Sequence, residues 1–364
     1  MTEPAAVAGR GWTTSESGSA GSETKGGRAP RSQFGDAQEP PKQRAAIIVN
    51  PTKFHSPERV KDTLTTICLS KGWEAPLWLE TTAEDPGAGQ TQEAIAAEVD
   101  VVCALGGDGT VRTVGAELVD TGVPMGLLPG GTGNLLARNL DLPAEDISKA
   151  MKIVLSGRNQ RIDSVTATIT QPAEEVDESA EESEASTSAP LGETKTSEHI
   201  FFVMAGMGFD AEVMAGVEED LKDKVGWLAY VVSGAKNLKG ASFSADLTCE
   251  DGTKVHRKMR TIIIGNVGKL QGGVVLLPEA ASDNGRLDAI VLAPKGVSEW
   301  ATVATQIATR HKYGHDRVER FNSERFLVKT GKPVQVQLDG DTLGQAIELD
   351  VKVNPASLVV RLPA

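Results

Sequence analysis

The residues with the clearest chemical meaning form a glycine-rich loop at positions 106–110, with the sequence Gly-Gly-Asp-Gly-Thr. The apolar run Val99–Leu105 leads into this loop, and the pattern predicts a helix after it. Glycines let backbone N–H groups approach a phosphate, and a helix N-terminus adds partial positive charge. Asp108 would repel phosphate, so it fits if it holds Mg²⁺ or accepts a proton from an attacking hydroxyl. The structural alternative is a strand-to-helix turn with an aspartate cap.

A second loop of the same kind lies at Gly130–Asn134 and also connects an apolar run, Met125–Leu128, to an expected helix, Leu135–Asn139. Asn50 and Thr52 likewise follow an apolar run. Loops at the carboxyl ends of neighbouring parallel strands meet in one crevice. The three segments therefore predict one nucleotide site. The sequence has neither a Walker A motif nor the dinucleotide fingerprint, so the phosphates need a different loop design.

Strand and helix patterns alternate through the first half of the chain. Strands are expected at 45–49, 76–79, 99–105 and 125–128, and helices at about 57–70, 89–98, 110–119 and 135–139. This alternation predicts an α/β nucleotide-binding domain, residues 44–158, built on a doubly wound parallel sheet.

Strand-like segments dominate the second half. They lie at 162–170, 199–205, 242–248, 255–265, 273–277, 286–293, 326–329, 333–338, 346–353 and 357–362. Helical patterns occur only at about 218–238 and 297–311. The second domain, residues 159–364, is therefore expected to be mainly β and sandwich-like, with a cleft between it and the first domain.

Two segments are too polar to build a core. Residues 1–43 are rich in small and polar side chains and are expected to be a disordered tail. Residues 171–198 carry nine acidic residues and one basic residue, which predicts a disordered insertion within a hairpin. A regulatory arm is the alternative interpretation of this insertion.

Charge and cysteine content limit the class of protein. The formal net charge of −13 argues against nucleic-acid binding. The three cysteines are Cys68, Cys103 and Cys249, an odd and widely separated set that indicates buried thiols in a reducing compartment. We expect no signal peptide, and no apolar run reaches the length of about 18 residues that would span a membrane. The expected protein is cytoplasmic, with at most peripheral membrane contact.

The Asn50-Pro51-Thr52 segment and the two glycine loops together resemble the diacylglycerol kinase catalytic domain. The pattern is most similar to soluble bacterial lipid kinases, which are related to sphingosine kinases, and the resemblance covers roughly residues 44–364. Further matching segments are Ala205–Ala211, Ala281–Asp288 and Leu338–Asp341. The resemblance implies an ATP-binding α/β domain followed by a β-rich lipid-binding domain.

The resemblance also implies an activity and its residues. The cofactors would be ATP and Mg²⁺, and the acceptor a membrane lipid, most simply diacylglycerol, reached by peripheral membrane contact. Asp339 would be the general base, Asp108 would organise the catalytic Mg²⁺ through water, and Asp341, where the family has Glu, would contact the nucleotide or its metal. The nucleotide would be bound by Asn50, Thr52, Thr82, Gly106, Gly107, Gly109, Thr110, Gly130, Gly131, Thr132, Gly133 and Asn134.

Two positions depart from the family pattern. The family has glycine and basic residues after its Asn-Pro segment, and here Lys53, with Arg59 second, is the expected phosphate-binding cation. A structural Mg²⁺ of the family uses an aspartate where this chain has Asn284, beside Asp283. Loss of that charge weakens a hard-cation site.

Three alternatives remain open from the sequence. The acceptor could be a sphingoid base, ceramide or a glycolipid. The chain could be a nucleotide- or lipid-binding regulator without catalysis. An NAD kinase also carries Gly-Gly-Asp-Gly-Thr, although its expected Asn-Glu pair and Thr-Gly-Ser-Thr segment are absent here. An exposed sheet edge would also allow a homodimer.

Overall fold

The computed structural model describes residues 42–172, 194–208, 242–270, 274–294, 299–300, 302–303 and 318–364. Four predicted segments lie wholly or partly outside these residues. They are nearly all of the tail, the middle of the acidic insertion, the helix expected at 218–238 and most of the helix expected at 297–311. Among the described residues, no helix has both the length and the apolar character needed to cross a bilayer.

The first part of the chain forms a parallel sheet. Its strands are β1 (Ala45–Val49), β2 (Leu77–Glu80), β3 (Val101–Gly106) and β4 (Met125–Pro129), in the order β2-β1-β3-β4. Every residue of β1, β3 and β4 is buried, which explains their continuous apolar runs.

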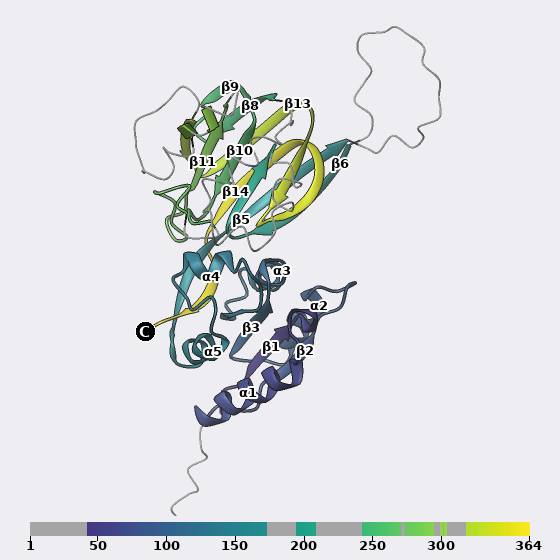
Figure 1. Cartoon of the computed structure of the whole chain (residues 1–364), viewed down its shortest axis with the longest axis vertical. Coiled ribbons are helices and arrows are strands. Elements are labelled where there is room, and N and C mark those ends of the chain that lie inside the picture. Colours follow the sequence, from purple (N-terminus) through teal and green to yellow (C-terminus); the bar gives the residue numbers. More distant parts are fainter. Residues whose placement is uncertain are drawn as a thin grey trace, which may run out of the picture. The chain divides into compact units, whose positions relative to one another are not determined.

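Helices cover both faces of this sheet (Figure 1). On one face, α1 (Pro57–Ser70) and α5 (Ile147–Ser156) pack on strand residues such as Ile47. On the other, α2 (Ala88–Ala96), α3 (Asp108–Leu118) and α4 (Leu135–Asn139) pack on residues such as Ile48. The predicted doubly wound α/β domain is therefore confirmed.

The second part is mainly β, as predicted. The strands β12 (Val318–Ser323), β11 (Leu287–Leu292), β10 (Thr261–Gly265), β7 (Met204–Met207) and β13 (Arg325–Leu338) pair antiparallel in that order. β8 (Phe243–Cys249) pairs with β13, and β9 (Lys254–Met259) pairs with β8. Alternate residues of β8 are buried in a separate apolar core, as expected for a half-buried strand.

Two long strands connect the two parts. β5 (Arg158–Pro172) pairs antiparallel with β14 (Asp341–Leu362), and β6 (Thr194–Phe201) pairs with β5. The end of β14 also pairs with β4, through Val360 and Met125. The last residues of the chain therefore return to the sheet of the first domain, which the predicted division at residue 158 did not include.

Several predicted boundaries were wrong. The segments 326–329 and 333–338 form one strand, and so do 346–353 and 357–362, because register shifts absorb the intervening Gly and Pro residues. The segment 255–265 divides into β9 and β10, 273–277 contributes only the bridge of Val275 with Lys269, and β12 was not predicted. Both ends of the predicted insertion belong to strands, because Gln171 and Pro172 of β5 pair with Lys195 and Thr194 of β6.

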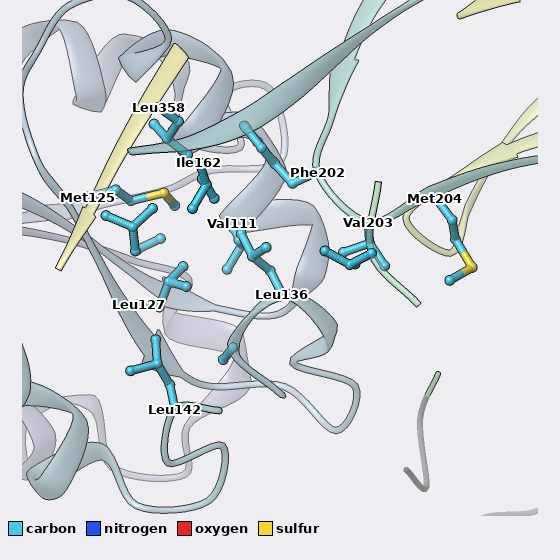
Figure 2. Close-up of a cluster of buried hydrophobic side chains, with 14 of the residues drawn as sticks. Val111, Met125, Leu127, Leu136, Leu142, Ile162, Phe202, Val203, Met204 and Leu358 are labelled. Atoms are coloured by element: carbon cyan, nitrogen blue, oxygen red, sulfur yellow. The ribbon is translucent and has the colours of Figure 1, made fainter. Parts of the chain in front are cut away.

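One apolar cluster runs from the helices of the first domain to the segment that precedes β7 (Figure 2). Phe202, Val203 and Met204 belong to this cluster, together with Val111 of α3 and Leu136 of α4. The Phe202 ring lies against α3 so closely that a Cβ added at Gly115 would be 2.6 Å from it. This packing fixes the backbone of residues 202–204, which the site uses.

Candidate active site

The two glycine loops lie against each other, as the sequence predicted. The Gly130 N–H donates to the Gly106 carbonyl over 2.9 Å. A Cβ at Gly130 would lie 2.9 Å from the Gly106 Cα, and one at Gly131 would lie 2.8 Å from the Gly107 Cα. Real Cβ atoms do not approach backbone this closely, so glycine is required where the loops touch.

The Asn50 segment lies at the same end of the sheet. The Asn50 N–H donates to the Leu105 carbonyl at the end of β3, and its Oδ1 accepts from the Thr52 N–H and hydroxyl, at 3.1 and 2.7 Å. Lys53 lies beside the first loop, with its Cε 3.9 Å from where a Gly107 Cβ would be. Lys53 is thus the predicted cation that the structure brings to the loop, whereas Arg59 lies in the first turn of α1.

Three threonines occupy different positions. Thr82 is exposed just after β2, and its hydroxyl accepts the Asp85 N–H in the turn before α2. Thr110 is buried and packs over Gly106, whereas Thr132 is exposed on the second loop. Of the two threonines in the glycine loops, Thr132 is therefore the exposed one.

Asp108 joins the first loop to the second. Its Oδ1 accepts the Leu135 N–H at 2.6 Å, and a Cβ at Gly133 would collide with its Oδ2. Burial raises the pKa of Asp108, the N–H groups of Leu135 and Asn134 oppose the rise, and the nearby Asp341 carboxylate adds to it. The carboxylate of Asp108, the first residue of α3, is therefore held toward the start of α4.

Asn134 closes the second loop. Its backbone is left-handed, with φ 45°, and its side chain is buried. The Nδ2 donates to the carbonyls of Gly131 and Ala144, at 2.7 and 2.9 Å, and the Oδ1 accepts the Gly131 N–H. Its side chain thus shapes the loop, and the role of Asn134 in cradling phosphates stays a prediction.

Asp339 lies in the tight turn between β13 and β14. Its φ of 50° and that of Gly340, 95°, are the left-handed values that such a hairpin turn needs. Asp339 is 5% exposed, and its carboxylate accepts three backbone N–H groups. Phe202 donates to Oδ2 at 3.0 Å, and Val203 and Met204 each donate to Oδ1 at 2.9 Å.

Opposing effects set the proton affinity of Asp339. Burial raises its pKa to about 6, while the three backbone N–H groups and the Arg112 guanidinium limit the rise. A carboxylate with a pKa near 6 is a better proton acceptor than an ordinary aspartate and is still ionised at neutral pH. These properties suit a general base.

Arg112 connects the two halves of the site, and the sequence did not reveal it. Its Nη1 donates to the Leu338 carbonyl and its Nη2 to the Asp341 Oδ2, both at 2.7 Å. Arg112 lies four residues after Asp108 on α3, hence on the same helix face. That spacing is the one signal that could have suggested a functional arginine.

Two carboxylates at the first loop fit a hard cation. Asp341 lies beside this loop, with its Oδ2 3.2 Å from where a Gly109 Cβ would be, and it is close enough to raise the pKa of Asp108. Mg²⁺ prefers carboxylate oxygens, keeps several waters, and binds together with phosphates. Asp108 and Asp341 are therefore the residues that would hold it.

The loop predicted for a structural Mg²⁺ is closed by hydrogen bonds. The Asn284 Oδ1 accepts the Arg286 N–H at 3.0 Å, and the Asp163 carboxylate accepts the Gly285 N–H at 2.7 Å. Asp283 is exposed. Within the described part of the chain, no three His, Cys, Asp or Glu side chains form a metal cluster. A metal at Asn284 and Asp283 stays a prediction.

Comparisons with known proteins agree with this geometry. Residues 44–167 match the diacylglycerol kinase catalytic domain, and residues 203–362 match the YegS C-terminal NAD kinase beta sandwich-like domain. The "Probable lipid kinase YegS-like" of Pseudomonas putida is 30% identical over 276 residues, which cover 75% of this chain and 80% of that protein. The chain belongs to the diacylglycerol kinase family.

Other members extend the comparison. A "Diacylglycerol kinase" of Bacillus subtilis is 27% identical over 305 residues, 82% of this chain and 90% of that one. The crystal structure of a diacylglycerol kinase from Bacillus anthracis has the same fold, with a TM-score of 0.61 at 17% identity, covering 89% of this chain and 98% of that one. The chain is thus a kinase of the lipid kinase type, and nucleotide use follows from the family.

Replacing Arg112 with methionine is expected to lower kcat for phosphoryl transfer about tenfold, because two hydrogen bonds between α3 and the Asp339 turn are lost. Arg325→Met is the matched control, since Arg325 also forms a pair with a carboxylate of β14, that of Asp350. Steady-state kinetics of both purified variants test this. Equal kcat values in the two variants would show that Arg112 only supports the fold.

Proposed function

We propose that this kinase transfers the γ-phosphoryl group of Mg²⁺-ATP to a hydroxyl of diacylglycerol, giving phosphatidic acid and ADP. The names of its relatives in Bacillus subtilis and Bacillus anthracis support this acceptor. The acceptor is a membrane lipid, so the protein must reach a bilayer surface, and we propose peripheral contact.

Each part of the site has a role in this reaction. The backbone N–H groups of the loops at 106–110 and 130–134 cradle the phosphates, and Lys53 contacts the transferred group. Asp108 and Asp341 would hold Mg²⁺, which would supply positive charge near the phosphate oxygens. Asp339 accepts the proton of the lipid hydroxyl.

The observation that best supports the proposal is the pair of hydrogen bonds made by the Arg112 guanidinium. Arg112 belongs to the helix that begins at Asp108, and its guanidinium contacts both residues that flank the Asp339 turn, Leu338 and Asp341. The proposed base and the proposed metal-binding loop are thus held in one hydrogen-bonded unit. In-line phosphoryl transfer requires such mutual positioning.

Transfer of radiolabelled phosphate from ATP into mixed micelles tests the proposal. Separate micelles carry diacylglycerol, monoacylglycerol, ceramide, sphingosine or a glycolipid, and Asp339→Asn protein runs alongside the parent. Label in phosphatidic acid, lost in the variant, is the expected result. Label in another lipid would overturn the diacylglycerol assignment and keep the kinase. ATP binding without label in any lipid would favour the regulator.

A further inference from the structure

A buried asparagine lies behind the proposed base. Asn266 directly follows β10 and has no exposed surface. Its Nδ2 donates to the carbonyls of Phe202 and Asp163, at 3.0 and 3.1 Å, and its backbone N–H donates to the Val203 carbonyl at 2.9 Å. Asn266 therefore forms hydrogen bonds with the same segment whose backbone N–H groups donate to Asp339.

The same two peptide groups contact both Asn266 and Asp339. In the peptide group between Phe202 and Val203, the carbonyl accepts from the Asn266 side chain and the N–H donates to the Asp339 Oδ1. In the next, between Val203 and Met204, the carbonyl accepts from the Asn266 backbone and the N–H donates to the same oxygen. Hydrogen bonds in such a chain polarise one another and fix the direction of the peptide planes.

The two ends of the Asn266 amide have different environments. Two carbonyl acceptors fix which end of the amide is the Nδ2, because the opposite orientation would place oxygen against oxygen. The Oδ1 is then buried without a hydrogen-bond partner in the described structure. An unsatisfied buried acceptor is destabilising, and an apolar side chain of similar size would avoid it only by losing the two hydrogen bonds to the Phe202 and Asp163 carbonyls. Those two hydrogen bonds, which fix the segment next to Asp339, offset the cost of the buried Oδ1.

We propose that Asn266 is a positioning residue for phosphoryl transfer, acting through the peptide groups of residues 202–204 to aim the Asp339 carboxylate at the acceptor hydroxyl. This inference rests on the proposed function. In the step that it assists, the lipid O–H bond breaks, its proton moves to Asp339, the oxygen bonds to the γ-phosphorus, and the bond to the β-phosphate oxygen breaks toward ADP. Asn266 contacts no reacting atom.

The first test is Asn266→Leu in the full chain, with ATP and the lipid that the micelle assay shows to be phosphorylated. We expect kcat to fall by about tenfold or more, since misdirection of a reacting group is costly. The KM for ATP should stay within about twofold, because the glycine loops keep their contacts. The matched control is Asn139→Leu, which also loses an Nδ2 that donates to two backbone carbonyls, those of Leu135 and Lys269. The control should lose thermal stability and keep kcat.

The decisive test combines Asn266→Leu with Asp339→Asn. If Asn266 acts through Asp339, the double variant should match the kcat of Asp339→Asn within about twofold. An additional tenfold loss in the double variant, an unchanged kcat in Asn266→Leu, or an equal loss in the Asn139 control would each overturn the inference.

Three further outcomes have a defined meaning. Should Asn266→Leu fail to fold, Asn266→Ser replaces it under the same criteria, since serine keeps the backbone N–H and loses the double donor. Should Asp339→Asn alone keep the parent kcat, the general-base role in the proposed function fails, and the inference with it. Should Asp339→Asn be impaired while Asn266→Leu is not, only the inference fails.

Discussion

Replacing Asp339 with asparagine should lower kcat for lipid phosphorylation by about 10²- to 10⁴-fold, the range that a general base contributes. Asparagine has the shape of aspartate, and its one oxygen can still accept the backbone N–H groups of Val203 and Met204, while its Nδ2 would face the Phe202 N–H. It cannot take the proton of the acceptor hydroxyl. ATP affinity, measured by calorimetry, should be unchanged, because the nucleotide loops are not altered.

The same residue sets the expected pH dependence. The pKa of Asp339 is raised to about 6 by burial, so the basic form predominates above this pH and is lost as the pH falls through it. The parent kcat should therefore fall about tenfold per pH unit below about pH 6. The Asp339→Asn variant should lack this acidic limb.

The control is Asp350→Asn, because Asp350 is a carboxylate of the neighbouring strand β14 and pairs with Arg325 rather than with the site. Its kcat and its pH profile should match those of the parent. An Asp339→Asn protein that keeps more than about a tenth of the parent kcat would contradict the assignment of the base.

Local sequence was sufficient for much of this fold. The apolar runs of β1, β3 and β4 identified buried parallel strands, and the loop glycines at 106–107 and 130–131 identified the end of the sheet where the loops meet. Both signals are local: burial on two faces requires a continuous apolar run, and close backbone approach requires glycine.

Contacts between residues far apart in the sequence could not be predicted in this way. Arg112 and Leu338 are 226 positions apart, and Asp339 bonds to N–H groups 135–137 positions earlier in the chain. No spacing rule relates such residues, so neither the two hydrogen bonds of the Arg112 guanidinium nor the burial of Asp339 could be predicted. Asn266 was missed for the same reason, since its partners Phe202 and Asp163 are 64 and 103 positions away.

The predicted lengths of β13 and β14 were wrong for a different reason. Gly331 and Pro333 in β13, and Pro355 in β14, are residues that normally end strands. Here register shifts absorb them, and Ala356 takes a left-handed φ of 51°. The long pairing with β5 stabilises β14 across the irregularity, which a single-segment pattern cannot anticipate.

The second large effect is expected for Asp108→Asn, which should lower kcat about 10³-fold at low Mg²⁺ and raise the Mg²⁺ concentration for half-maximal activity. The asparagine Oδ1 can still accept the Leu135 N–H, so the contact between the loops is kept while the charge is lost. Removing this charge also relieves its repulsion of Asp341, so the loop should not be destabilised. The defect should therefore lie in metal use rather than in folding.

Titration of Mg²⁺ at saturating ATP and lipid measures this directly. The matched control is Asp146→Asn, because Asp146 also accepts a backbone N–H at a helix N-terminus, that of Lys149 in α5, at 2.9 Å. Its Mg²⁺ dependence and kcat should equal those of the parent, with at most a small loss of thermal stability. If the Asp108 variant is impaired but its Mg²⁺ dependence is that of the parent, Asp108 organises the loops and not the metal. Asp341 would then be the carboxylate to test next, since among the described residues it also lies beside the first loop.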